Sequence, residues 1–480
     1  MAADREAPHP GSMATPTREP RPDRRVLWSA FLALALLYAG SAWIRIHYTL
    51  TDPGFDVSDP TGLLKSDPGL LYYITEKVIA AGGLPPSDFH ADPGPAWPDK
   101  VDLPATFNVG EEYIIAWAWR LFGGEGPLHV FIVKVMAWVA AATIFGVYGL
   151  SFELTRKASL ALLAAALYAV LPYNYRTVGM ILLREDLALP LYALHLWLAA
   201  RAVRTGGRLA WIGAGVALTL ALESWHALGF FLNLEVAALW LFLLRTGENP
   251  LARPRSWMAL VCLLIGGLTL PVLTSKAVLF SPAVIGCFAL LAAAQAAARL
   301  PKLCCRALWT SFAALLVLLG IVALLRFLGV GSQVDYGHVT SFLWAKLSTF
   351  GQLPQDPSAL PFDVRLLWQG PFVTATWQTF RLGLGLGVAG AAVLLVNGAW
   401  VWLRKREDQV ELLGSAFFAL SLFSAWMVER TMILPAVLLP ALCARFARRH
   451  GAGLVSPLVY AACVLGQATW FLVAVDQVRQ

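Results

Sequence analysis

The residues YNYRTVGMILLREDLALPLYALHLWLAARAVR, numbered 173 to 204, decide how this chain folds. The stretch begins as a polar loop, passes through an Arg-Glu-Asp triplet at 184–186, and continues as a long apolar run closed by two arginines. A charge at the centre of a bilayer costs roughly 2.5–3.5 kcal/mol, so acids beside such a run belong at the end of a membrane helix. One interpretation is a capping pair, because acids in a first helical turn favour the helix dipole. The other is a functional acidic site at the mouth of that helix.

The composition excludes an ordinary soluble domain. Apolar residues make up 58% of the 480 residues and charged residues only 14%, whereas a soluble domain is usually about 25% charged. Several runs reach about 18 or more apolar residues, and the alternation of about ten residues that is typical of a membrane β-barrel is missing. We therefore predict an all-α, polytopic membrane protein embedded in the lipid bilayer. The net charge of +7 does not indicate a nucleic-acid partner, because the basic residues lie between the apolar runs.

The apolar runs predict about thirteen transmembrane helices. They cover approximately 26–47, 128–152, 157–175, 185–203, 209–224, 226–245, 257–274, 276–298, 307–328, 382–403, 411–428, 431–446 and 453–475. Residues 1–25 have no apolar face and are predicted to be a disordered tail, which leaves 26–480 as one transmembrane domain. Two long polar segments, 48–127 and 329–380, interrupt the runs, and the first contains an amphipathic helix at 111–122 that we expect at the membrane surface.

Basic residues predict the orientation of the chain. They occupy every second gap between runs, at 24–25, 156–157, 201–208, 245–255, 299–306, 404–406 and 445–449. Such gaps face the cytoplasm, so the N-terminus is predicted to be cytoplasmic, and both long loops to be external or lumenal. The membrane is then a bacterial or archaeal plasma membrane or the endoplasmic reticulum membrane.

Three sets of polar residues share the predicted external face. Asp67 precedes an expected helix that carries Tyr72 and Tyr73; its alternative role is an N-cap. Glu185 and Asp186 are the second set, and carboxylates can act as general bases or hold a hard divalent ion. Arg430 is the third, because its guanidinium fork suits a phosphate.

Other polar residues have simpler explanations as well. Arg430 has two, an ion pair with the neighbouring Glu429 and a cation that reaches the membrane surface. Trp225, in a short external turn with His226, is otherwise a membrane-interface anchor. The second long loop adds polar residues that are more often solvated than functional; they are Asp335, His338, Lys346, Asp356 and Asp363.

Ionisable residues inside apolar runs support a different class of protein. Glu235, Lys134 and His195 lie within such runs, and a proton-coupled transporter would need groups of this kind. A buried pair of Lys134 with Glu235 is the simpler account. A transporter or lipid flippase therefore remains an alternative, and a non-catalytic scaffold is a third.

The layout and several short motifs resemble the integral-membrane glycosyltransferases of the GT-C type, in particular the catalytic subunit of oligosaccharyltransferase and the protein C-mannosyltransferases. The motifs are SDPGLLYYITEKVIAAGGLP from 66, LLREDLALPLYALHLWLAARA from 182, ESWHALGFFLNLEVAALWLF from 223, HVTSFLWAKL from 338 and MVERTMILPAVLLPALCARF from 427. Together they span about residues 26–450. The resemblance implies transfer of a sugar from a polyprenyl-phosphate-linked donor to a protein or glycan acceptor on the external or lumenal face.

The same resemblance implies roles for single residues. Asp67 would be the first catalytic acid, and Glu185 with Asp186 the second acidic site. Arg430 would contact the donor phosphate, with Arg184 as a second candidate, and the supporting residues would be Tyr72, Tyr73, Trp225, His226 and His338. Two departures leave alternatives open. The soluble C-terminal domain of oligosaccharyltransferase does not follow the last run, and the second motif lacks a clean Asp-x-Asp. The acidic site would therefore hold Mg²⁺ or Mn²⁺ at Glu185 and Asp186, or need no metal, as in the C-mannosyltransferases.

Overall fold

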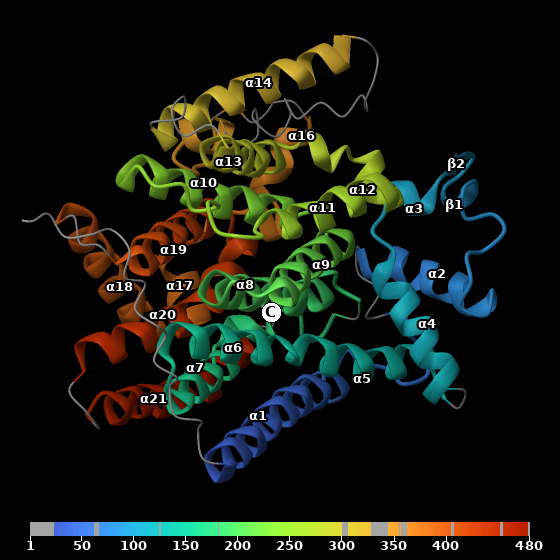
Figure 1. Cartoon of the computed structure of the whole chain (residues 1–480). Helices are drawn as coiled ribbons and strands as arrows, with labels where there is room; N and C mark the ends of the chain where they lie inside the picture. The colour runs from blue at the N-terminus through green and yellow to red at the C-terminus, as the bar shows by residue number, and fades with distance from the viewer. Residues whose placement is uncertain are drawn as a thin grey trace, which may run out of the picture.

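The computed structural model describes most of the chain as a bundle of helices (Figure 1). The described residues are 24–61, 67–123, 126–180, 182–299, 306–327, 344–354, 356, 362–404, 408–451 and 455–478. The predicted tail at 1–25 lies almost wholly outside these ranges, as do Asp335 and His338 of the second long loop.

Every predicted apolar run corresponds to helix in the described residues. The helices are α1 (Arg24–Leu50), α5 (Leu128–Ala141), α6 (Thr143–Thr155), α7 (Ala158–Ala169), α8 (Glu185–Thr205), α9 (Arg208–Ser224), α10 (Leu228–Thr246), α11 (Trp257–Thr269), α12 (Pro271–Ser275), α13 (Pro282–Arg299), α14 (Ala307–Phe327), α17 (Trp377–Leu384), α18 (Gly387–Leu403), α19 (Gln409–Met427), α20 (Ile433–His450) and α21 (Val455–Val478). The all-α polytopic fold is confirmed. Within the described ranges, eight helices are long and apolar enough to cross a membrane, or nine if α17 and α18, bent by 107°, form one span. The number thirteen stays a prediction.

Small residues allow the central helices to pack closely. α8 lies against α6 on one side and α9 on another, and α20 also packs on α6. A Cβ atom added to Gly146 would come within 2.5 Å of the Cβ of Ala193, and one added to Gly149 would overlap the ring of Trp197. Helices in membranes associate through close backbone approach of this kind. α8, which carries the two acids at its start, is therefore held by packing on several sides.

The first long loop folds as a separate group of short elements, gathered at the right of Figure 1. It contains α2 (Asp67–Ala80), α3 (Leu103–Thr106), α4 (Gly110–Phe122) and an antiparallel hairpin of β1 (Asp92–Ala96) and β2 (Asp99–Val101). The hairpin was not expected from the sequence. Asp92 fixes it to α2, because its buried carboxylate accepts hydrogen bonds from Lys77 at 2.6 Å and from the Tyr73 hydroxyl at 2.9 Å.

The helix α4 differs in part from the expected surface helix. Trp117, Leu121 and Phe122 are exposed, as an amphipathic surface helix requires, but Glu111 and Glu112 at its start are buried. Its acidic end therefore belongs to the interior of the protein rather than to the solvated face.

The described part of the second long loop returns to the bundle next to η7 (Glu429–Met432). It contains α16 (Phe362–Arg365), η5 (Leu366–Trp368) and η6 (Gly370–Phe372). The backbone N–H of Glu429 donates to Val373 O at 2.9 Å, and the N–H of Ala375 donates to Trp426 O at 2.9 Å. These bonds fix the loop beside Arg430.

Lys346 was expected to be a solvated loop residue, and this expectation is wrong. Its side chain is buried, its ammonium donates to Thr374 Oγ1 at 3.0 Å, and it lies 5.0 Å from the centroid of the Trp368 ring. Burial lowers the pKa of Lys346 to about 8. Asp356, in contrast, is exposed as expected.

Candidate functional site

Glu185 is the centre of a buried ion cluster at the start of α8. Its side chain is fully buried, and both carboxylate oxygens accept hydrogen bonds from arginines. Arg430 binds in a bidentate manner, with Nε 3.1 Å from Oε1 and Nη2 2.9 Å from Oε2. Arg176 adds a third bond, from Nη1 to Oε1 at 3.0 Å. Such charge-assisted, forked contacts are the strong class of hydrogen bond, so the three side chains form one unit.

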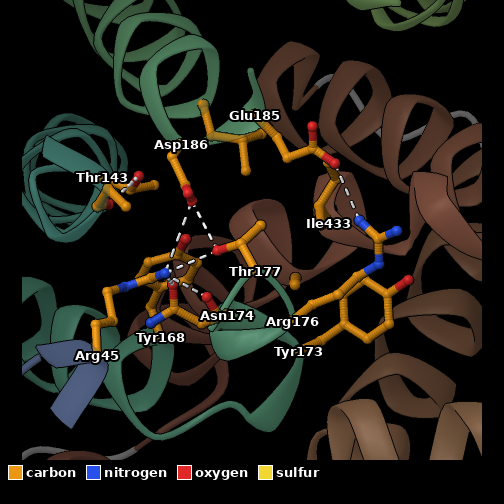
Figure 2. A pocket seen from close by; sticks show the side chains of 13 residues that line it. Arg45, Thr143, Tyr168, Tyr173, Asn174, Arg176, Thr177, Glu185, Asp186 and Ile433 are labelled. Carbon is orange, nitrogen blue, oxygen red and sulfur yellow. Dashed lines mark hydrogen bonds and ion pairs between the residues drawn. The ribbon is translucent and has the colours of Figure 1, made fainter. Parts of the chain in front are cut away.

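Asp186 has a separate set of partners, as Figure 2 shows. Thr177 donates to its Oδ1 at 2.7 Å, and Nη1 of Arg45 lies 3.7 Å from the same oxygen. Arg45 also donates to Thr177 at 3.0 Å and to Asn174, at its side-chain oxygen (2.9 Å) and its carbonyl. α1 and the loop before α8 are thereby tied to the second acid.

A small cavity lies beside both acids. Arg45, Thr143, Tyr168, Arg176 and Ile433 are among the residues that line it. Its volume of about 20 Å³ is enough for one water molecule and far too small for a sugar ring. This cavity by itself therefore does not hold the sugar.

Arg430 lies between aromatic rings and an acid from another helix. Its guanidinium carbon is 5.2 Å from the centroid of the Trp225 ring and 5.9 Å from that of Phe372. Two simpler explanations are thereby wrong. Arg430 pairs with Glu185 rather than with its neighbour Glu429, and Trp225 is buried, with 3% of its surface exposed, rather than placed as an interface anchor.

Arg184 belongs to a second acidic cluster, formed with the first long loop. Its Nη2 lies 3.9 Å from Oε1 of Glu112, and its guanidinium lies 5.9 Å from the centroid of the Phe107 ring. In the described part of the chain, the carboxylates of Glu111 and Glu112 have no hydrogen-bond partner. Burial raises the pKa of Glu112 to about 7, and burial together with the Glu112 charge raises the pKa of Glu111 well above its ordinary value.

The remaining residues that were predicted for the site lie in different parts of the structure. Asp67 is the first residue of α2, and its side chain lies outside the described part of the structure. Tyr72 is buried against Leu182, whereas Tyr73 binds Asp92 of the hairpin. His226 is in the turn after α9, where its ring Nδ1 lies 3.3 Å from Asn108 Oδ1. The structure thus joins Glu185, Arg430 and Trp225 directly, while Tyr73 serves the hairpin.

The polar residues inside the apolar runs are paired differently from the expectation. Glu235 accepts a hydrogen bond from the Tyr192 hydroxyl at 2.9 Å, and its other oxygen lies 3.3 Å from His195 Nε2. Lys134 is exposed on the helix surface. The suggested pair of Lys134 with Glu235 is therefore wrong.

Sequence reasoning missed Arg45, Arg176 and Glu112. Arg45 lies near the end of the first apolar run, so the rule that ionisable residues within such runs are functional candidates would have selected it. Arg176 is in the stretch quoted at the outset, but a sequence does not show which acid an arginine contacts. Glu112 was hidden in an amphipathic pattern that suggested a surface helix.

The described acids do not fit a metal site. Both oxygens of Glu185 are bound by arginines, and Asp186 accepts from Thr177 with Arg45 nearby. Hard divalent ions are held by several oxygen ligands whose charge is not already neutralised by cations. Among the residues described, no group of three His, Cys, Asp or Glu side chains is arranged to hold a metal. Mg²⁺ or Mn²⁺ at Glu185 and Asp186 would first have to displace the arginines.

The fold is similar to that of a protein of known structure. No family model and no curated protein matches the sequence. Among solved structures, the chain is similar to the crystal structure of the Archaeoglobus fulgidus oligosaccharyltransferase, tethered to an acceptor peptide containing the NVT sequon by a disulfide bond. The TM-score is 0.57 at 15% identity, and the match covers 94% of this chain and 55% of the other. The chain thus shares the fold of an oligosaccharyltransferase over just over half of that protein's length. The likeness to C-mannosyltransferases stays a prediction.

Proposed function

We propose that this protein is a membrane glycosyltransferase that moves a sugar from a polyprenyl-phosphate-linked donor to a protein or glycan acceptor. The observation that carries the proposal is the buried arginine–carboxylate cluster of Arg430 and Glu185 within a fold that matches an oligosaccharyltransferase over 94% of this chain. Transfer from a lipid phosphate needs a cation for the phosphate and an acid for the acceptor. The external or lumenal face is the proposed side of reaction.

Arg430 is proposed to bind the donor phosphate. A guanidinium fork matches two phosphate oxygens, and its charge opposes the negative charge that develops on the leaving phosphate. The rings of Trp225 and Phe372 support the guanidinium in this position. Arg184 is separated from this role by its pairing with Glu112, so we place it in the neighbouring acidic cluster.

Asp67 is proposed to act on the acceptor as a general base. The residue opens α2, whose Tyr72 packs with Leu182 in one hydrophobic cluster, close in sequence to Glu185. Glu185 and Asp186 are proposed to hold Arg176, Arg45 and the loop at 174–177 in place. General-base catalysis contributes typically about 10²–10⁴-fold, so loss of Asp67 should be far more costly for turnover than for donor binding.

A transfer assay tests the proposal directly. Purified protein in detergent is incubated with a panel of radiolabelled polyprenyl-phosphate and polyprenyl-diphosphate sugars, and with peptide or glycan acceptors. We expect label in the acceptor fraction with at least one donor, and loss of that label in the Arg430→Ala variant. Absence of transfer across the panel, from protein shown to bind the donors, would contradict the assignment.

The alternative is a polytopic transporter or lipid flippase. The bend of 107° between α17 and α18 is the observation that favours it, because broken helices often line transport sites. Detergent solution distinguishes the two functions, since a transporter produces no measurable product without two compartments. Lipid movement in sealed vesicles, without transfer in detergent, would support the alternative.

A further inference from the structure

We propose that the carboxylate of Glu185 occupies, in the ligand-free protein, the place on Arg430 that a phosphate oxygen of the donor takes. Arg176 then keeps Glu185 neutralised after Arg430 has turned to the phosphate. This inference rests on the proposed function, and it concerns the residues that are exchanged when the donor binds. Glu185 would act as an internal competitor of the donor rather than as a group that touches the acceptor.

Arg430 binds Glu185 through a forked contact. Arg430 uses Nε and Nη2 together on the two oxygens of Glu185, at 3.1 and 2.9 Å. This is the forked arrangement in which guanidinium groups also bind phosphate. The same edge of the guanidinium cannot bind both anions at once, so a phosphate that approaches this edge must displace Glu185.

The two arginines are more exposed than the carboxylate that they bind. The side chain of Glu185 is 0% exposed, whereas those of Arg430 and Arg176 are 15% and 19% exposed. An incoming anion can therefore reach the arginines while Glu185 stays behind them. Glu185 is also fixed at the start of α8, which packs against α6 and α9. Arg430 comes from the short 3-10 helix η7, and the exchange requires only its side chain to turn.

Glu185 has a second cationic partner in addition to Arg430. Leaving a buried carboxylate without a partner usually costs several kcal/mol, which would oppose the exchange. Arg176 donates to Glu185 Oε1 at 3.0 Å, so the carboxylate keeps one charged partner when Arg430 leaves. Donor binding is then opposed only by the difference in free energy between Glu185 paired with both arginines and Glu185 paired with Arg176 alone.

The experiment measures the affinity of purified variants for farnesyl phosphate, with farnesol as the control ligand that lacks the phosphate. We expect Glu185→Gln to bind farnesyl phosphate at least about fivefold more tightly than the wild type, the lower end of ordinary coupling between sites. Arg430→Ala should bind it at least about tenfold more weakly, because a close charge pair is lost. Farnesol binding should be unchanged in both variants.

Double variants separate exchange from a general change in charge. In the Arg430→Ala background, Glu185→Gln should no longer tighten binding, because the guanidinium that Glu185 would release is missing. Asp186→Asn removes one negative charge from the next residue without freeing Arg430, and it should not tighten binding. Equal tightening by Asp186→Asn, or tightening that persists without Arg430, would overturn the exchange.

A variant of Arg176 should change the affinity for farnesyl phosphate in the opposite direction. This variant keeps the test valid if Glu185→Gln folds poorly. Arg176→Gln should weaken farnesyl phosphate binding, because Glu185 then depends on Arg430 alone. The same change should have no effect in the Glu185→Gln background. Further weakening there would show that Arg176 touches the phosphate itself and would contradict its assigned place.

The proposed function and the proposed exchange are contradicted by different results. If Arg430→Ala binds farnesyl phosphate as well as the wild type does, the donor assignment under the proposed function is wrong. If Arg430→Ala weakens binding while a folded Glu185→Gln variant binds no more tightly than the wild type, only the exchange is wrong.

Discussion

The guanidinium of Arg430 lies over the ring of Trp225, with 5.2 Å between the guanidinium carbon and the ring centroid. The two residues come from η7 and from the turn after α9, which are about 200 positions apart in the sequence. A buried tryptophan beneath an arginine that is only 15% exposed supplies a favourable surface for a cation that has given up most of its water. Trp225 is therefore a positioning residue for Arg430.

Replacement of Trp225 should weaken donor binding without abolishing it. A cation–π contact is worth about 0.5–2 kcal/mol, so Trp225→Leu should lower the affinity for farnesyl phosphate by about 2–30-fold. Trp225→Phe keeps a ring and should lose less. Trp97, which is 80% exposed on the hairpin, gives the control variant Trp97→Leu, which should bind normally. Equal affinities of Trp225→Leu and wild type would remove Trp225 from the site.

Replacement of Asp67 should affect the chemical step. Asp67→Asn keeps the size of the side chain but not its basicity, so turnover should fall by about 10²–10⁴-fold while donor affinity stays the same. Glu76 lies on the same helix and is exposed, so Glu76→Gln is the matched control. The measurement is turnover and donor affinity on variants with equal melting temperatures. Near-normal turnover of folded Asp67→Asn would exclude Asp67 as the base.

Chelation should leave activity in place. The oxygens of Glu185 are bound by arginines, which leaves no free carboxylate pair among the acids proposed as metal ligands. Transfer in the presence of EDTA should therefore equal transfer in buffer. Loss of activity in EDTA, with recovery on addition of Mg²⁺ or Mn²⁺ but not Ca²⁺, would show that a metal displaces these arginines.

The acidic cluster of α4 should make stability depend on pH. Burial raises the pKa of Glu112 from an ordinary 4.5 to about 7, so the folded state favours the protonated acid. The stabilising effect is complete below pH 4.5 and is lost as the pH rises toward 7. Glu112→Gln should therefore raise the free energy of unfolding at pH 8 by up to about 3 kcal/mol, and the melting temperature with it. At pH 4.5 the melting temperature should change little. A variant that melts lower than the wild type at pH 8 would show that Glu112 is held as a needed ion-pair partner of Arg184.

The orientation of the chain can be tested with single cysteines in a cysteine-free background. A cysteine at position 404 should be protected from a membrane-impermeant maleimide in intact cells, because the basic gap around it is predicted to face the cytoplasm. A cysteine at position 353, in the second long loop, should be labelled. Labelling of position 404 from outside would reverse the predicted orientation.

The sequence predicted the helices well because each depends on a local property, the length of an apolar run. Glu185, Arg430 and Trp225 could also be selected as candidates, since charges and a Trp-bearing turn at helix ends are conspicuous in an apolar chain. Their partners could not be read in the same way. The pairing of Arg430 with Glu185 joins residues 245 positions apart, and it depends on how α8, α9 and η7 pack. The burial of Glu112 likewise results from the packing of the first loop on the bundle.

Arg45 connects the first helix to residues that are synthesised much later. It stands near the end of α1, and its partners Asn174, Thr177 and Asp186 are made more than a hundred residues later. α1 is therefore made long before these partners, and the contacts of Arg45 with the loop at 174–177 form only after that loop has been made. A chimera in which α1 is replaced by an uncharged anchor helix would still enter the membrane. It would lack the hydrogen bonds that tie α1 to Asn174 and Thr177 beside Asp186, so the N-terminal helix is a component of the site rather than an interchangeable membrane tether.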